Sequence, residues 1–479
     1  MQNLWSHTGR GIAVSALALA LTACQSMRGP EPVAQTSIPS SYTAAASGTS
    51  VAEQGYKDFF ADQRLLQVLD MALNNNRDLR TATLNIQRAQ QAYQITENNQ
   101  LPTIGASGSV LRQDQGGGAQ TRYNVLLGVT AYELDFWGRV RSLKDNALDS
   151  YLATQSSRDA TQIALIGQVA QAWLNYSFAN ANLKLADQTL KTQLESYNLN
   201  KKRFDVGIDS ELPVRQAQIS VETARNDVAN YKTQVAQAQN LLNLLVGEQV
   251  PSALLPTQRV TRITNTTAFG AGLPSDLLNN RPDIRTAEYR LSAAGANIGA
   301  AKARLFPSIS LTGNAGYAST DLSDLFKSGS FVWAVGPSID LPIFDWGTRQ
   351  ANIKISETDQ QIALADYEKS IQSAFREVND ALAVRQNIGD RLAAQKRLVD
   401  ATNTTYKLSN ARFRAGIDNY LTVLDAQRTS YAAEQGLLLL EQANLNNQVE
   451  LYKSLGGGVK TNTSDVTSQP ASSAERKAQ

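Results

Sequence analysis

The two halves of this sequence carry the same motifs in the same order. Asp78–Ala82 (DLRTA) returns 205 positions later as Asp283–Ala287 (DIRTA). Arg203–Asp209 (RFDVGID) returns 209 positions later as Arg412–Asp418 (RFRAGID). Collinear matches of this kind indicate an internal repeat, so we predict one architecture built twice.

Each half has the same predicted order: a helix, a β-hairpin, a very long helix, a tight turn and a returning helix. The long helices, 139–206 and 348–415, contain no Pro. At ~1.5 Å per residue each would reach roughly 100 Å. Apolar residues recur every three or four positions from Val214 to Leu245, which predicts a coiled-coil seam. The helices alone would also suit an ordinary antiparallel coiled-coil hairpin.

The two predicted hairpins have a period of two. Apolar residues alternate with small polar ones, as in Ile309, Leu311, Ala315 and Tyr317. This pattern and the strand length fit a membrane barrel, although the edge of a soluble sandwich is the alternative. Four strands cannot close a barrel in lipid, so other copies of the chain would have to supply the rest. Two copies or three would serve, and the pattern does not choose between them.

The first residues resemble the export signal of a bacterial lipoprotein. A short apolar run, Gly11–Leu21, precedes Leu21–Cys24 (LTAC), and Cys24 is the only Cys in the chain. We expect a diacylglycerol and an N-acyl chain on Cys24 and no other cofactor; a plain secretory signal with a chance Cys is the alternative. Gln25 follows Cys24, which by resemblance to the enterobacterial sorting rule favours the outer membrane.

The predicted organisation covers the whole chain. Its segments are a signal peptide (1–23), a lipidated N-terminal tether (24–61), a first repeat (62–247) with hairpin 102–136, long helix 139–206 and returning helix 210–246, an equatorial linker (248–273), a second repeat (274–456) with hairpin 307–344, long helix 348–415 and returning helix 418–455, and a disordered tail (457–479).

The composition argues against nucleic-acid binding, catalysis and metal binding. The net charge of +2 gives no reason to expect a nucleic-acid partner. The one His, His7, lies in the predicted signal peptide, so no His remains for nucleophilic catalysis and too few ligands remain for a structural zinc. We expect no catalytic residues, no metal site and no enzyme activity.

The stretch Arg412–Arg428 (RFRAGIDNYLTVLDAQR) resembles the TolC family of outer-membrane factors, in its lipidated OprM-like branch. The resemblance covers nearly the whole mature chain. It implies an α+β membrane protein whose homotrimer forms a twelve-stranded β-barrel continued by a twelve-helix coiled-coil α-barrel. It also implies a periplasmic adaptor (membrane fusion) protein and an inner-membrane RND pump as partners in multidrug efflux.

The same resemblance implies the site residues. A periplasmic gate would be formed by Leu421, Asp425, Arg428 and Phe413, the last standing where the family often has Tyr. Adaptor docking would use the helix tips Val206, Gly207, Ile208, Ala415, Gly416 and Ile417. An ordinary solvated carboxylate at Asp425 and simple helix capping at the two Gly are the alternatives.

Two rival functions remain open. One is the outer-membrane duct of a type I protein secretion system. The other is a structural periplasmic coiled-coil lipoprotein, against which the amphipathic strands argue.

Overall fold

The computed structural model describes residues 27–29, 32–35, 42, 49–50, 54–114, 116–265, 269–270 and 276–457. The predicted signal peptide, Cys24 and the tail beyond 457 lie outside these residues. The chain divides into two compact units. The first comprises Met1–Thr36, Leu84–Ser156 and Asp283–Ser370, and the second comprises Ser37–Thr83, Ser157–Pro282 and Ile371–Gln479.

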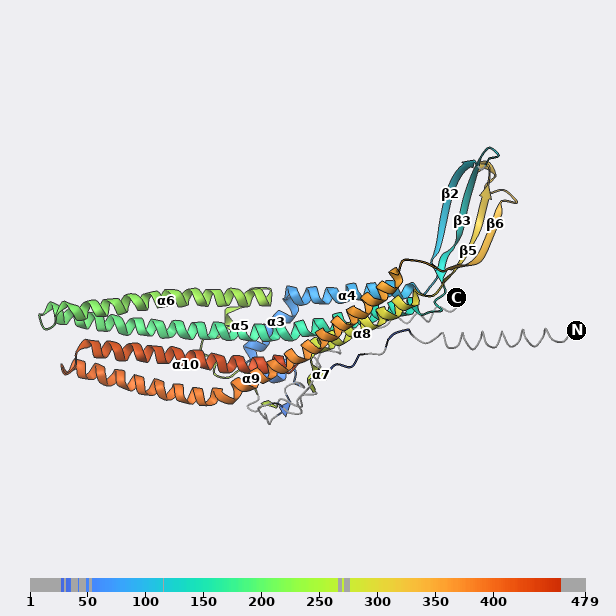
Figure 1. The fold of residues 1–479 in the computed structure, drawn as a ribbon. Coiled ribbons are helices and arrows are strands. Elements are labelled where there is room, and N and C mark those ends of the chain that lie inside the picture. Colours follow the sequence, from blue (N-terminus) through green and yellow to red (C-terminus); the bar gives the residue numbers. More distant parts are fainter. Residues whose placement is uncertain are drawn as a thin grey trace, which may run out of the picture. The chain divides into compact units, whose positions relative to one another are not determined.

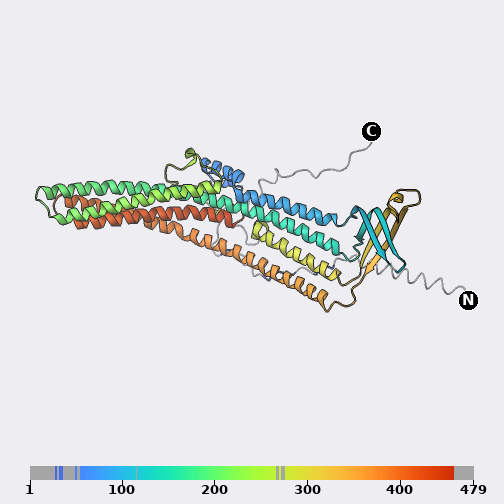
Figure 2. The ribbon, with the colours of Figure 1, turned by 90° about the horizontal axis from the view of Figure 1, so that it is seen from above.

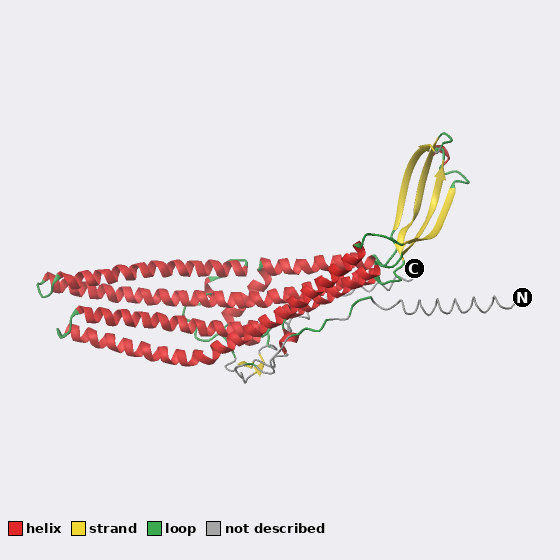
Figure 3. Ribbon diagram, viewed as in Figure 1, coloured by secondary structure: helices red, strands yellow, loops and turns green. Residues whose placement is uncertain are grey.

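Four antiparallel strands form the sheet of the first unit, in the order β2-β3-β5-β6 (Figure 1, Figure 3). They are β2 (Ile104–Asp114), β3 (Ala119–Glu133), β5 (Ser308–Ser319) and β6 (Phe331–Asp340). Leu127 lies opposite Ala315, which lies opposite Trp333. Since residues directly opposite share a face, the apolar residues of three strands gather on one side of the sheet.

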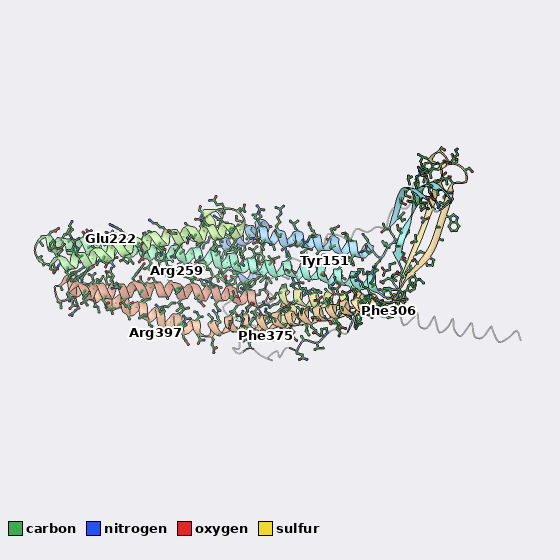
Figure 4. All side chains as sticks on the ribbon, turned by 45° about the horizontal axis from the view of Figure 1, so that its top comes forward. Tyr151, Glu222, Arg259, Phe306, Phe375 and Arg397 are labelled. Carbon is green, nitrogen blue, oxygen red and sulfur yellow. The ribbon has the colours of Figure 1, made fainter. Side chains whose placement is uncertain are left out.

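A bulge interrupts β3 between Val129 and Tyr132, where Ala131 adopts a positive φ of 52°. Just beyond β3, Trp137 stacks on Phe306, with ring centroids 4.6 Å apart (Figure 4 marks Phe306). Trp137 Nε1 also donates to the backbone oxygen of Pro307 at 2.8 Å. This contact joins the end of one hairpin to the start of the next.

The long helices are α5 (Arg139–Asp205) and α9 (Thr348–Arg414), each of 67 residues. α6 (Glu211–Val246) lies beside the second-unit part of α5, and α10 (Tyr420–Ser454) beside that of α9 (Figure 1, Figure 2). Within the described part of the chain, no helix is both long and apolar enough to cross a membrane.

The buried residues of α6 follow the predicted seam from Val214 to Leu242. Val246 then takes the buried place expected for Leu245. A straight helix has 3.6 residues per turn and drifts from a strict heptad, which accounts for this change at the end of the seam.

The helix predicted at the start of each repeat is broken in two. The breaks fall at Asn76 and Arg281, which are 205 positions apart. The helices are α3 (Gln63–Asn75), α4 (Arg77–Asn98), α7 (Asp276–Asn280) and α8 (Pro282–Ala303). The Asn76 side chain accepts from the backbone N of Leu79 at 2.8 Å and so caps the second helix of its pair.

The core of the second unit includes residues expected in the tether. Phe59 and Phe60 are fully buried, with their ring centroids 4.5 and 5.6 Å from that of Tyr452. The predicted tether, 24–61, therefore extends too far, because the aromatic residues at its end are fully buried in this core.

Short elements complete the described chain. They are β1 (Thr49–Ser50), which pairs in parallel with β4 (Phe269–Gly270), α2 (Tyr56–Phe59) and the 3-10 turns η2 (Ser252–Leu254) and η3 (Leu322–Asp324).

Candidate gate and docking site

The two helix tips are built in the same way. Gly207 and Gly416 both have φ of 74°, a conformation that Gly adopts without steric cost. Ile208 N donates to the oxygen of Arg203 at 2.9 Å, and Ile417 N to that of Arg412 at 3.0 Å. These bonds, with those from the two Gly N–H groups one residue earlier, satisfy the last carbonyls of α5 and α9.

An ion pair closes each tip. Arg203 Nε donates to Asp209 Oδ2 at 2.6 Å, and Arg412 Nε donates to Asp418 Oδ2 at the same distance. Arg412 makes a second hydrogen bond to Asp418 Oδ1 at 2.9 Å. The hydrogen bonding from Arg412 holds the pKa of the Asp418 carboxyl below its usual value.

The tips present apolar side chains to solvent. Val206, Ile208 and Ile417 are each about two-thirds exposed. In a helix end of this type, the residue after the Gly commonly packs back against the last turn. Here Ile208 and Ile417 stay exposed, which suits a surface that receives another molecule.

Leu421, Asp425 and Arg428 lie on the exposed side of α10, close to the tip. Their spacing of four and then three residues places them on one helix face. The other side is buried and carries Tyr420, Val423, Ala426 and Gln427. Asn419 caps the start of the helix, because its Oδ1 accepts from Thr422 N at 3.2 Å. The structure therefore brings three of the four predicted gate residues onto one surface.

Phe413, the fourth predicted gate residue, lies elsewhere. Its side chain is only 4% exposed and packs in a cluster with Ala217, Tyr420 and Val423. The Phe413 ring lies 5.6 Å from the Tyr420 ring, and the Arg203 guanidinium lies 5.2 Å from the Phe413 centroid. Phe413 therefore supports the helix that carries the exposed residues and does not share their surface.

Arg203 is a residue that sequence reasoning left out of the site. It joins the tip of α5 to Phe413 near the tip of α9, while it also pairs with Asp209. A cation over an aromatic face is attractive, especially where water is partly excluded. The available signal was its place in the repeated motif, where the equivalent residue is Arg412.

A cavity of about 390 Å³ adjoins Phe413 and Arg203. Two buried polar groups that line it, Asn200 Oδ1 and Tyr420 Oη, have no hydrogen-bond partner among the described residues. Burial raises the pKa of Tyr420 to about 12, with a smaller contribution from Tyr406, so the phenol stays neutral. The packing around Phe413 is therefore incomplete on the side of the cavity.

No metal-binding group is apparent in the described chain, since no three His, Cys, Asp or Glu side chains there are placed to hold an ion. The lipidation residue Cys24 lies outside the described residues.

Comparison with known proteins places this geometry in a family. The family model for the outer membrane efflux protein matches residues 68–248 and 273–457, one range in each half. The probable efflux pump outer membrane protein TtgC of Pseudomonas putida is 44% identical over 432 residues, which cover 88% of this chain and 89% of that protein. The cation efflux system protein CusC of Escherichia coli O157:H7 is 38% identical over 451 residues, covering 92% and 97%.

Solved structures agree. The open state of the Neisseria gonorrhoeae MtrE outer membrane channel matches with a TM-score of 0.84 and 38% identity, covering 91% of this chain and 99% of that one. A membrane protein from Pseudomonas aeruginosa matches with a TM-score of 0.85 and 37% identity, covering 91% and 98%. The predicted fold class, with long coiled-coil helices, β-strands and an internal duplication, is confirmed. The chain belongs to the outer membrane efflux protein family, whose members are TolC-like channels and not enzymes.

Proposed function

We propose that this chain is the exit duct of a tripartite RND-type pump, which passes drugs and other amphiphiles across the outer membrane. Relatives in Pseudomonas putida are described as outer membrane proteins of antibiotic, toluene and solvent efflux pumps. The observation that carries the proposal is the exposed face of α10 near its tip, where Leu421, Asp425 and Arg428 lie opposite a buried face.

Leu421 and Asp425 form the periplasmic gate in this proposal, with Arg428 holding it. Brought together around an axis by copies of the chain, Leu421 would form an apolar ring that excludes water. The Asp425 carboxylates would repel one another and favour opening unless a cation offsets them. Phe413 acts on the gate from within the protein, by packing against Tyr420 at the start of the same helix.

The working assembly is a homotrimer with a twelve-stranded barrel and a twelve-helix α-barrel. The sheet of the described chain ends at β2 and β6, whose outer edges pair with no described strand. Such edges are not viable in lipid, so a second copy must cover them if the strands span the membrane.

The docking partner at the tips is a periplasmic adaptor (membrane fusion) protein, which connects the duct to an inner-membrane RND pump. Its contact surface comprises Val206, Gly207, Ile208, Ala415, Gly416 and Ile417. The exposed apolar side chains at both tips support this assignment.

The mature protein is held in the outer membrane by its strands and by acyl chains on Cys24, with a large part in the periplasm. Two or three acyl chains would anchor it stably, at about 0.8 kcal/mol per buried methylene. This anchor, the internal duplication and the Arg412–Arg428 motif together support the finer placement in the OprM-like branch, near AdeK.

The test is efflux of a preloaded fluorescent dye from cells that lack this protein and redundant ducts. Deletion should slow efflux, and the wild-type chain should restore it. The Leu421→Ala/Asp425→Ala variant should admit large antibiotics that wild-type cells exclude, because the gate has lost both its apolar and its charged ring.

The internal repeat supplies a matched control. Leu212 and Gln216 occupy the positions equivalent to Leu421 and Asp425 in the first repeat, and Leu212 is also exposed. Leu212→Ala/Gln216→Ala should leave the antibiotic barrier intact. If efflux does not depend on the protein, with expression and trimer verified, a duct for protein secretion becomes the better explanation.

A further inference from the structure

Four residues beyond Cys24, the chain is fastened to a helix of the first unit. Arg28 Nη2 donates to the backbone oxygen of Ser292 at 2.9 Å and to its Oγ at 2.6 Å. The same nitrogen lies 3.9 Å from Asp149 Oδ2. A residue in the predicted tether is thus held at a defined place, by charged hydrogen bonds on one helix and an acid on another.

Two glycines on α8 make room for Arg28. Ser292, Gly295 and Gly299 lie on one face of the helix because they are spaced by three and four residues. A Cβ on Gly299 would lie 3.2 Å from the backbone N of Arg28, and a Cβ on Gly295 would lie 3.5 Å from its Nε. The Arg28 backbone therefore rests on α8 where side chains are missing.

The neighbouring helix, α5, completes the site. Ser292 Oγ donates to Asp149 Oδ2 at 2.6 Å, so this hydroxyl accepts from Arg28 and passes a hydrogen bond to the acid. One turn earlier, Asn146 Nδ2 donates to the backbone oxygen of Ala293 at 2.8 Å and holds the two helices together. We call Ser292, Gly295 and Gly299 of α8, with Asp149 of α5, the anchor site.

The chain makes one more such contact before it leaves the first unit. Gln35 N donates to Glu368 Oε1 at 2.7 Å on α9. Gln35, like Arg28, therefore contacts a helix of the first unit.

We infer that the anchor site binds the N-terminal segment through Arg28 and fixes where the lipid on Cys24 enters the membrane. This rests on the proposed lipidation. Between Cys24 and Tyr56, a buried residue of the second unit, a free tether could span about 100 Å. With Arg28 bound, only four residues remain, or about 14 Å.

The position of the anchor site along α8 makes that short reach useful. Gly299 lies near the end of α8 at Ala303, and β5 begins at Ser308. At ~1.5 Å per helical residue and up to ~3.4 Å per extended residue, the chain from Gly299 to Ser308 spans at most about 25 Å. The acyl chains would thus be kept beside the strand that they accompany into the membrane.

Trypsin cleavage after Arg28 tests the inference on the full, palmitate-labelled trimer in detergent. In the wild type the bond from Arg28 to Gly29 should be cut slowly, because a bound guanidinium cannot enter the protease. Asp149→Ala/Ser292→Ala should speed this cut about 10- to 100-fold, since it removes charge-assisted hydrogen bonds. Mass spectrometry measures the two products, which are the large fragment that begins at Gly29 and the short palmitate-labelled fragment that ends at Arg28.

Gly299→Val provides a second variant, because a Cβ there would lie 3.2 Å from the backbone N of Arg28. It would also lie 2.8 Å from Ser142 Oγ of α5, so the thermal stability of this variant is compared with the wild type first. Gly389→Val is its matched control: Gly389 is also within a helix, and a Cβ there meets nothing within 4 Å. The control should cut as slowly as the wild type. Equal rates in the wild type and both anchor-site variants would overturn the inference. If the wild type is cut slowly but carries no palmitate label, the result refutes lipidation and still supports binding of Arg28 at the anchor site.

Discussion

Asp418 should make the second helix tip sensitive to acid. Arg412 lowers the pKa of the Asp418 carboxyl in the folded protein, so the pair stabilises the tip fully above the unfolded pKa of about 3.9. That stabilisation is lost as pH falls through the lower, folded value. We expect the Ile417 amide, which is bonded to Arg412 O, to lose protection from hydrogen exchange at low pH.

Asp418→Asn is the variant that isolates this effect. Its Ile417 amide should exchange faster than the wild type at neutral pH and show no further acid loss, once the intrinsic exchange rate is corrected. An acid loss of the same size in both proteins would assign the effect to another carboxyl.

Phe413 should matter to the gate through packing. Replacing a buried Phe by Ala costs about 3–5 kcal/mol, and the existing cavity beside Phe413 would enlarge. Phe413→Ala should therefore lower the free energy of local opening around Tyr420, measured by hydrogen exchange, and increase antibiotic entry. Leu408→Ala, at an exposed position on the same helix, should change either quantity far less. Similar effects from both substitutions would mean that the cluster does not support the gate.

At the scale of elements, local signals were sufficient for most of the helices and strands. The long helices have no Pro and end two residues before Gly207 and Gly416, whose positive φ does not fit a right-handed helix. The strands show a period of two over segments that the structure pairs in register. Both signals depend on residues close in sequence, which is why they could be interpreted without the fold.

Tertiary contacts decided what the sequence left unresolved. The break at Asn76 depends on an amide that also donates to the oxygen of Leu245 at 2.8 Å, a partner 169 positions away. Phe413 was assigned to the gate by resemblance, but only the packing of Ala217 and Tyr420 around it shows that it is buried. Arg28 carries no local signal at all, because its site is formed by residues more than a hundred positions later.

At the scale of the whole molecule, the duplication predicts how copies of the chain meet. Inside one chain, the first hairpin pairs with the second through β3 and β5. In a ring of copies, β6 must meet β2 of the next copy in the equivalent way. Trp137 stacks on Phe306. Their equivalents in the other repeat are Trp346 and Leu101, whose side chains are 87% and 65% exposed. We expect Trp346 to cover Leu101 of the neighbouring copy.

The same argument gives the strand register between copies. Val129 pairs with Gly313 inside the chain, and the hairpin registers make Ile339 and Gly108 their equivalents. The separation in sequence between Val129 and Ile339 is one residue longer than that between Trp137 and Trp346, because the bulge in β3 adds a residue between Val129 and Trp137. Ile339→Cys/Gly108→Cys should therefore form a disulfide-linked ladder between copies on a non-reducing gel, since directly opposite Cβ atoms lie about 4.5–5.5 Å apart. Ile339→Cys/Arg112→Cys, displaced by about 13 Å along the strand, should form none. A ladder from the displaced pair, or none from either pair in a verified trimer, would show that the two junctions are not equivalent.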